Sequence, residues 1–458
     1  MALRVVHRPT RTTHPAPTEE PREVGAPPAL PDGKSQGNPL MTILPMVGMM
    51  ASLTIMMVMR NPAFMALGAV VLCIALLGAL LMLFSRRGQV GRQRRNQREL
   101  YLQYLEELRE KLSEWEQRTR AHARLLDPPP EALYDVLRDP KRLWERRRRH
   151  NDFLKVRVGT GVAPGRSLTL AEQGTALAPT DPFMQSEAQG VIERFATIPD
   201  MPFTLPLDMT GNISVVGERE DLMRLVRAMI AQFSVFHAPE DAGLAVSYPE
   251  EHADDWSWLL WLPQVLDPQR REQGVATRLI APSPQDLGVL LADELRSRSD
   301  FASEVRRGMG RREAYQMLRR LLVIHDTHGE VATELVRPDH TVDPAALGVT
   351  VVHLVSRQID EPGEVNVRVT VTGDRVEIED LRPEEPLVST GVLDDVSPAT
   401  LTGLARMIAP LRLSPESIEE TAQEGGRVDF TAMLGVRDPG DMDVQRLWAP
   451  RSERAFLR

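Results

Sequence analysis

Two long uncharged stretches stand out in the hydrophobic pattern of this chain. Residues 41–59 read MTILPMVGMMASLTIMMVM and residues 63–84 read AFMALGAVVLCIALLGALLMLF, with only Arg60, Asn61 and Pro62 between them. A helix needs about 20 apolar residues to cross a bilayer, so each stretch is long enough for one span. Two buried core helices or a signal peptide are the alternatives, but a signal peptide begins at the terminus and has one shorter apolar run. We therefore predict a transmembrane hairpin over residues 39–86.

Charges around this hairpin predict its orientation. The connecting turn holds only one basic residue, Arg60. More basic residues lie before the first stretch and after the second: Arg4, Arg8, Arg11, Arg86, Arg87, Arg92, Arg94 and Arg95. Because an excess of Lys and Arg stays on the cytoplasmic side, we expect both termini and the bulk of the chain in the cytoplasm. Residues 1–38 form a Pro-rich polar tail with too few large apolar groups for a core.

An amphipathic pattern follows the second stretch, over residues 92–124. Apolar and aromatic side chains recur there at spacings of three and four, which is typical of a helix: Tyr101, Tyr104, Leu105, Leu108, Leu112 and Trp115. The stripe fits a helix that packs on its own domain, and it fits equally a stalk that contacts another subunit. We treat residues 87–150 as a helical stalk, and Tyr101, Leu105, Leu108, Leu112 and Trp115 as candidate partner contacts.

A basic run closes this stalk at Arg146–Arg149. Such runs are usually a solvated helix end. Contact with anionic lipid or an acidic partner is the alternative, since the run lies downstream of the apolar stretches.

From Phe153 onward, short apolar strands alternate with helical patterns. Expected strands are 154–158, 212–216, 243–247, 277–280, 320–324, 349–355, 365–371 and 375–379, and expected helices are 186–196, 220–233, 287–297, 305–318 and 398–408. This alternation indicates βαβ units. The fold class is therefore α/β, with a mostly parallel, P-loop-like sheet covered by helices over residues 151–430.

Composition narrows the candidate chemistry. The 458 residues include 55 Lys and Arg against 64 Asp and Glu, a net charge of −9, which argues against a general nucleic-acid coat. A single cysteine excludes a disulfide framework and multi-cysteine metal sites.

The first strand–helix junction of the sheet domain, Val215–Leu222, is where a nucleotide would bind. A phosphate loop reads GxxxxGK[ST], in which glycines admit the phosphates, the lysine neutralises them and the hydroxyl holds Mg²⁺. Only Gly217 is present, and Glu218, Glu220 and Asp221 stand nearby. A carboxylate about 4 Å from a phosphate costs about 4 kcal/mol of repulsion at an effective dielectric of about 20. We therefore expect these acids to cap a helix that begins near Glu220, and the loop not to bind nucleotide.

A second candidate position is Asp326, which follows the apolar strand 320–324. An acid at this place can hold Mg²⁺ through water, but the glutamate that would activate water is absent after it. His325 and His328 have no third ligand at a useful spacing, so we predict no metal site.

No motif of hydrolases, metalloproteases or dinucleotide-binding enzymes occurs, and we name no catalytic residue. The segment 254–263 holds three tryptophans. Trp258 and Trp261 have helical spacing and are either core residues or partner anchors, since Trp is frequent at interface hot spots.

Several motifs taken in order resemble one known family. These are the tail Pro21–Val24, the hairpin, Leu143–Arg147, Asp152–Gly161, His237–Asp241, the tryptophan cluster, Gly348–Val351, Leu404–Leu413 and Leu434–Gly435. Over nearly its whole length the chain resembles the N-terminal part of EccC, the membrane ATPase of the type VII (ESX) secretion system, related to FtsK/SpoIIIE translocases. The resemblance implies a membrane anchor, a stalk and a degenerate first ATPase-like domain in which only Gly217 and Asp326 align with motor motifs.

The same resemblance implies the setting. Residues 431–458 would be a linker toward a following motor domain, where Mg-ATP would bind; no cofactor is expected in this segment. Expected partners are the lipid bilayer of the bacterial inner membrane, EccB-, EccD- and EccE-like subunits and, through later motor domains, secreted proteins, but not nucleic acid. The leading hypothesis is thus an anchoring, assembly and coupling portion of a secretion motor that is not catalytic alone.

Two alternatives stay open at this point. The ATPase-like domain could itself bind or slowly hydrolyse ATP despite its loop. The chain could instead anchor a DNA translocase, although two spans, the lack of a long linker and the acidic charge weigh against that function.

Overall fold

A computed structural model describes residues 3–12, 14–17, 22–29, 47–54, 62–171, 180–306, 318–338 and 342–418. The chain forms two compact units. The sheet unit comprises residues 1–14, 123–162 and 200–458, and the helical unit comprises residues 15–122 and 163–199.

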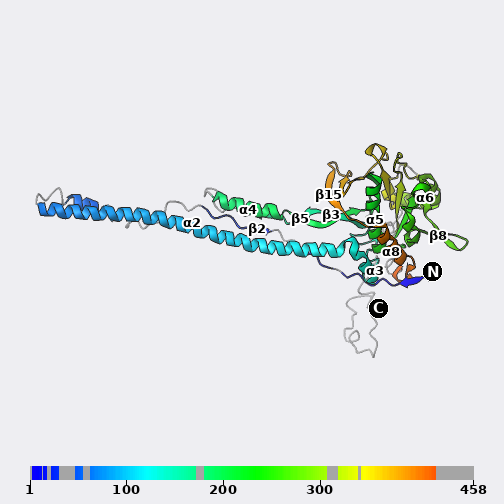
Figure 1. Cartoon of the computed structure of the whole chain (residues 1–458), viewed down its shortest axis with the longest axis horizontal. Coiled ribbons are helices and arrows are strands. Elements are labelled where there is room, and N and C mark those ends of the chain that lie inside the picture. Colours follow the sequence, from blue (N-terminus) through cyan, green and yellow to red (C-terminus); the bar gives the residue numbers. More distant parts are fainter. Residues whose placement is uncertain are drawn as a thin grey trace, which may run out of the picture. The chain divides into compact units, whose positions relative to one another are not determined.

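The helical unit is built on α2 (Pro62–Leu126), which Figure 1 shows as one uninterrupted helix. Pro62 stands at its first position, where a proline's missing N–H costs nothing. The stripe residues Tyr101, Leu105, Leu108 and Leu112 are buried, and they pack with α4 (Pro182–Phe195) and with the paired strands β2 (Arg22–Val24) and β4 (Leu168–Leu170). Most of the predicted stripe is therefore covered by its own chain.

The predicted hairpin is described only in part. Residues 47–54 are helical and the second apolar stretch belongs to α2, whereas 41–46 and 55–61 lie outside the described residues. Among the described residues, no helix has the length and apolar character of a membrane span.

The sheet unit contains a ten-stranded sheet in the order β10-β7-β11-β12-β6-β13-β14-β15-β3-β5. The strands from β10 to β13 pair in parallel, and β13, β14, β15 and β3 pair antiparallel. Their bounds are β3 Lys155–Pro164, β5 Thr197–Pro206, β6 Asn212–Gly217, β7 Ala242–Ser247, β10 Ile280–Ala281, β11 Arg320–Asp326, β12 Val349–Val355, β13 Val367–Thr372, β14 Arg375–Asp380 and β15 Leu387–Leu393. The expected mixed α/β fold with a mostly parallel sheet is confirmed.

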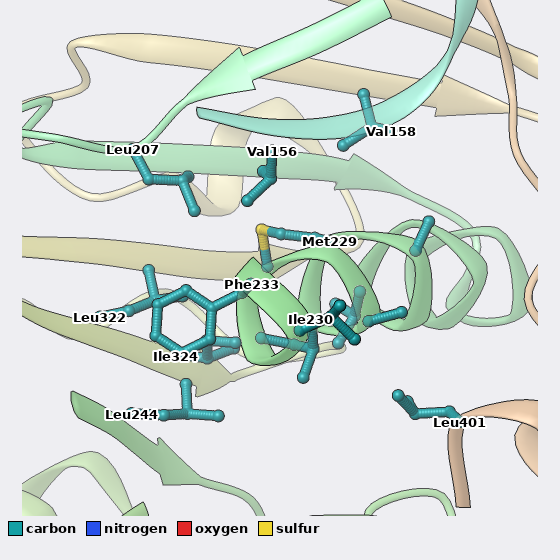
Figure 2. Packing of buried hydrophobic residues seen from close by; sticks show 14 of the residues in the cluster. Val156, Val158, Leu207, Met229, Ile230, Phe233, Leu244, Leu322, Ile324 and Leu401 are labelled. Carbon is teal, nitrogen blue, oxygen red and sulfur yellow. The ribbon is translucent and has the colours of Figure 1, made fainter. Parts of the chain in front are cut away.

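Alternate side chains of the central strands reach opposite faces of the sheet. In β11, Leu322 and Ile324 join the core around α5 (Arg219–Phe236), whereas Leu321 and Val323 join a second core around α6 (Pro284–Arg306). Figure 2 shows Phe233 of α5 beside Leu322 and Ile324. Apolar groups on both faces explain why these strands read as continuous hydrophobic runs.

Shorter elements complete the sheet unit. They are η1 Pro130–Ala132, α3 Leu133–Arg138, η2 Glu250–His252, η3 Ser257–Trp261, η4 Pro263–Val265, η5 Pro344–Leu347, η6 Gln358–Asp360, α8 Pro398–Ile408, the hairpin β8 Leu266–Glu272 and β9 Val275–Arg278, and the parallel pair β1 Arg4–Val6 and β16 Leu411–Leu413. Most of the expected helix 305–318 lies outside the described residues, since only its first two residues, in α6, and Leu318 are described.

Candidate functional site

The junction between β6 and α5, where the sequence retains one glycine of a phosphate loop, is very short. β6 ends at Gly217 and α5 begins at Arg219, so that Glu218 alone separates strand from helix. A phosphate loop needs several consecutive residues whose backbone N–H groups surround the phosphates. One residue cannot form such a loop, so its geometry is missing together with its lysine and hydroxyl.

Gly217 has a structural reason to be glycine. It pairs with Val371 of β13, and a Cβ atom at Gly217 would lie 2.6 Å from the Val371 carbonyl oxygen. Contacts this short are not tolerated by a side chain, so the glycine lets β6 and β13 approach each other. This requirement accounts for the one loop residue that the sequence shares with a phosphate loop.

Asp326 lies at the carboxyl end of β11, as the sequence predicted, with only β12 between β11 and β6. Its side chain is fully buried. Arg219 Nη1 lies 3.1 and 3.2 Å from its two carboxylate oxygens, and Oδ2 also accepts a hydrogen bond of 2.9 Å from Trp256 Nε1. His252 Nδ1 lies 3.1 Å from the same Oδ2. Three protein side chains thus contact the carboxylate oxygens to which a magnesium-bound water would otherwise donate.

Arg219 connects two carboxylates across this edge of the sheet. Its Nη2 donates to Asp255 at 2.7 Å while Nη1 contacts Asp326. Burial alone would lower the pKa of Arg219, but the hydrogen bonds and charges of Asp326 and Asp255 outweigh it and raise that pKa. The cation at the candidate site is therefore held by acids of its own chain.

We expected the nearby acids to cap α5, but their side chains do not do so. The helix begins at Arg219 rather than near Glu220, and its N-cap Glu218 makes no side-chain capping hydrogen bond. Asp221 instead accepts a 2.8 Å hydrogen bond from the Gly373 backbone N–H, in the turn between β13 and β14. Glu220 and Asp221 still stand in the first turn, where negative charge favours the helix dipole.

A row of buried polar side chains crosses the same end of the sheet. His325 on β11 is in register with His353 on β12 and with Ser247 on β7, and His353 is in register with Ser214 on β6. Ser247 Oγ lies 2.7 Å from His325 Nδ1, but neither ring nitrogen of His353 has a hydrogen-bond partner among the described residues. Burial lowers the pKa of His353 to about 4; burial and then the nearby His353 lower that of His325 to about 3.

Sequence reasoning missed His353 and Ser214 in this row. A histidine inside an apolar strand was the available signal for His353, while Ser214 lies in the expected strand 212–216. His328, which we had considered beside His325, is not part of the row. The part of the chain that the structure describes holds no group of three or more His, Cys, Asp or Glu side chains arranged for a metal ion.

The remaining candidate residues have different environments. Trp115 is half-buried, with the Arg166 guanidinium 5.2 Å from its ring centre. Trp258 is buried and its Nε1 donates to the Asp255 carbonyl oxygen, whereas Trp261 is 39% exposed beside Arg406. Contacts of these side chains and of the α2 stripe with another subunit stay predictions.

The basic run is largely built into the sheet unit, which differs from the solvated helix end we considered. Arg146 is fully buried, donates to Asp127 at 2.7 Å and lies over the Phe236 ring at 4.2 Å. Arg148 donates to Asp241 at 3.0 Å. These two arginines therefore hold the segment in place.

No protein-family model matches the chain. Among curated proteins, it is 28% identical to the ESX secretion system protein EccC of Thermomonospora curvata over 383 residues, which is 82% of this chain and 28% of that protein. It is 29% identical to EccC3 of the Mycobacterium tuberculosis ESX-3 system over 371 residues, 78% of this chain and 26% of that protein. The chain thus spans less than a third of the length of these relatives.

Solved structures give partial overlaps. The cytoplasmic domain of the Thermomonospora curvata type VII secretion ATPase EccC matches with 13% identity and a TM-score of 0.37, covering 64% of this chain and 35% of that one. ATPases 2 and 3 of EssC from Geobacillus thermodenitrificans match with 11% identity and a TM-score of 0.36, covering 60% of this chain and 50% of that one. The sequence comparisons confirm that this chain is related to the EccC proteins of ESX secretion systems.

Proposed function

We propose that this chain is the anchoring, assembly and coupling portion of a type VII secretion ATPase, and that its sheet unit acts without binding nucleotide. The observation that carries this proposal is the closed junction, defined as Gly217, Glu218 and Arg219 with the partners of Asp326. Mg-ATP could enter there only if Arg219 left two carboxylates and the one-residue junction unfolded.

The apolar stretches support the anchoring part of the proposal. Residues 41–59 and 63–84 are each uncharged and long enough for one span. The second stretch continues without a break into the polar part of α2. Residues 85–126 would extend that helix about 60 Å beyond the apolar stretch, at 1.5 Å per residue. Such a helix can carry a bilayer anchor and a cytoplasmic stalk in one rigid element.

This function places the chain in the bacterial inner membrane, with both termini in the cytoplasm. EccB-, EccD- and EccE-like subunits would then be its neighbours. Export of secreted proteins would draw on ATP bound elsewhere in the motor. An ion-paired junction suits a coupling role. Arg219 neutralises Asp326 without a ligand, so the sheet unit keeps the same structure while nucleotide binds and leaves elsewhere in the motor.

Nucleotide binding to the full chain in a mild detergent tests the proposal. Isothermal titration with Mg-ATP should give no saturable heat up to millimolar concentration. Micromolar affinity that is lost in Asp326→Ala but kept in Asp374→Ala would overturn the proposal. Asp374 is a matched control, since it is an exposed acid that pairs with Arg224 on the same helix α5.

A further inference from the structure

A basic cavity in the sheet unit shares no lining residue with the closed junction. Its volume is about 560 Å³, which is within the range of small-molecule sites. The N-terminal segment forms one wall and the residues after the basic run form another. The lining residues that matter here are Arg11, Arg147, Arg149, His150, Thr10 and Asp152.

Hydrogen bonds fix both walls of this cavity. Arg11 donates two hydrogen bonds to Asp152, at 2.8 and 2.5 Å, and its Nη1 lies 3.1 Å from His150 Nδ1. Arg147, which is buried, donates to the Pro9 carbonyl oxygen at 2.7 Å. Basic side chains from segments far apart in the sequence are thereby held around one space.

The charge of the lining favours an anion. Its lining includes three arginines and one acidic residue, Asp152. Burial raises the pKa of Asp152, but the hydrogen bond from Arg11 and the charges of Arg146 and Arg11 outweigh burial and lower it. The carboxylate is thus an ion-paired part of the wall. Glu145, which does not line the cavity, is a second acid beside Arg11, 3.7 Å from its Nε. Among the lining residues, three arginines outnumber the one carboxylate.

The basic run divides between two uses. Arg146 and Arg148 are paired with Asp127 and Asp241 and do not line the cavity, whereas Arg147 and Arg149 do. A guanidinium has five N–H donors, so it can keep a protein partner and still bind an anion. Thr10 and Thr12, each with a hydroxyl group, also line the cavity.

We propose that this cavity binds a phosphate-bearing anion through Arg11, Arg147 and Arg149. Planar guanidinium groups arranged around a common space match phosphate oxygens, which accept several charge-assisted hydrogen bonds at once. A lipid headgroup and a soluble phosphate ester share this chemistry. The site is independent of the proposed function, because it involves neither the closed junction nor the apolar stretches.

Thermal unfolding of the full chain in a mild detergent, titrated with sodium pyrophosphate, tests the site. Pyrophosphate should raise the midpoint of the wild type and of Arg148→Gln, while Arg149→Gln weakens binding about tenfold or more. Arg148→Gln is the matched control, since it removes the same charge from the same run outside the cavity. If Arg149→Gln does not fold, Arg149→Lys keeps the charge without the fork and should bind with intermediate affinity.

Short-chain phosphatidic acid, compared with phosphatidylcholine of the same chain length, distinguishes the two sources. Phosphatidic acid that binds more tightly than pyrophosphate, and depends on Arg149, supports a lipid headgroup. Tighter pyrophosphate binding with the same dependence supports a soluble phosphate ester. Binding of neither probe, or equal losses in Arg148→Gln and Arg149→Gln, would overturn the proposal.

Discussion

Replacing Arg219 by glutamine is the sharpest test of how the closed junction is held together. The substitution removes the cation that contacts both oxygens of the fully buried Asp326. Two unit charges about 4 Å apart attract by about 4 kcal/mol at an effective dielectric of about 20. Arg219 is 24% exposed, so solvent screens part of this attraction. We therefore expect Arg219→Gln to lower the free energy of unfolding by about 2–3 kcal/mol.

Urea unfolding followed by tryptophan fluorescence measures this loss. The reporters are suitable because Trp144, Trp256 and Trp258 are all buried in the sheet unit, and Trp256 itself donates to Asp326. Arg224→Gln is the matched control on the same helix. Its partner Asp374 is 78% exposed, and ion pairs of this kind contribute about 1 kcal/mol or less.

A double-mutant cycle separates the ion pair from the loss of arginine packing. Asp326→Asn removes the buried charge, so adding Arg219→Gln to it should cost clearly less than Arg219→Gln alone, with a coupling of about 1–2 kcal/mol. If Arg219→Gln costs no more than Arg224→Gln, or if the cycle shows no coupling, the Arg219–Asp326 pair does not hold the junction together.

Two further substitutions follow from the same end of the sheet. Burial lowers the pKa of His353 to about 4, below its ordinary value of 6.5. Between pH 4 and pH 6.5 the unfolded chain therefore binds more protons than the folded chain. The stability that is present above pH 6.5 is lost as the pH falls toward 4. His353→Leu should reduce this loss of unfolding free energy at low pH by about 3 kcal/mol and leave the stability at pH 7 unchanged or higher. Urea unfolding at several values from pH 4 to pH 7 measures both effects. A large loss of stability at pH 7 would contradict the prediction. Gly217→Ala should lower the free energy of unfolding by about 2 kcal/mol or more, because its Cβ would clash with the Val371 carbonyl oxygen. Gly190→Ala should stabilise the protein slightly, because a Cβ at this position in helix α4 meets open space. Equal thermal midpoints for the two variants would refute this prediction.

Sequence reasoning found the elements whose pattern is local. The apolar strands β6, β11 and β12 and the helices α5 and α8 were all anticipated, because burial on one or both faces leaves a period in the sequence. The strands β5 and β15 were missed. β15 exposes Leu387 and Val388 and lacks an apolar alternation, so its place depends on pairing with β14, which is not visible in its own residues.

The sequence alone indicated which phosphate-loop residues the candidate site lacks, but not which side chains contact Asp326. The missing lysine, second glycine and hydroxyl could be read from residues 215–222. The partners of Asp326 could not, because His252 and Trp256 lie about 70 residues away and reach it through η2 and the turn after it. The basic run was misleading for a similar reason, since Asp127 and Asp241, which pair with Arg146 and Arg148, lie in other segments.

The Arg219–Asp326 pair gives a physical reason for an acid to stay at the end of β11 without a metal. A buried carboxylate needs a compensating charge, because moving it out of water alone costs several kcal/mol. In a working phosphate site, magnesium supplies that charge only while nucleotide is bound. Here the first residue of α5 supplies it without a ligand, because Arg219 contacts both carboxylate oxygens, and Trp256 and His252 also contact Oδ2. Removing the arginine from a chain that already lacks the acid should therefore cost less than removing the arginine from the wild type, because no buried charge is then left without its partner.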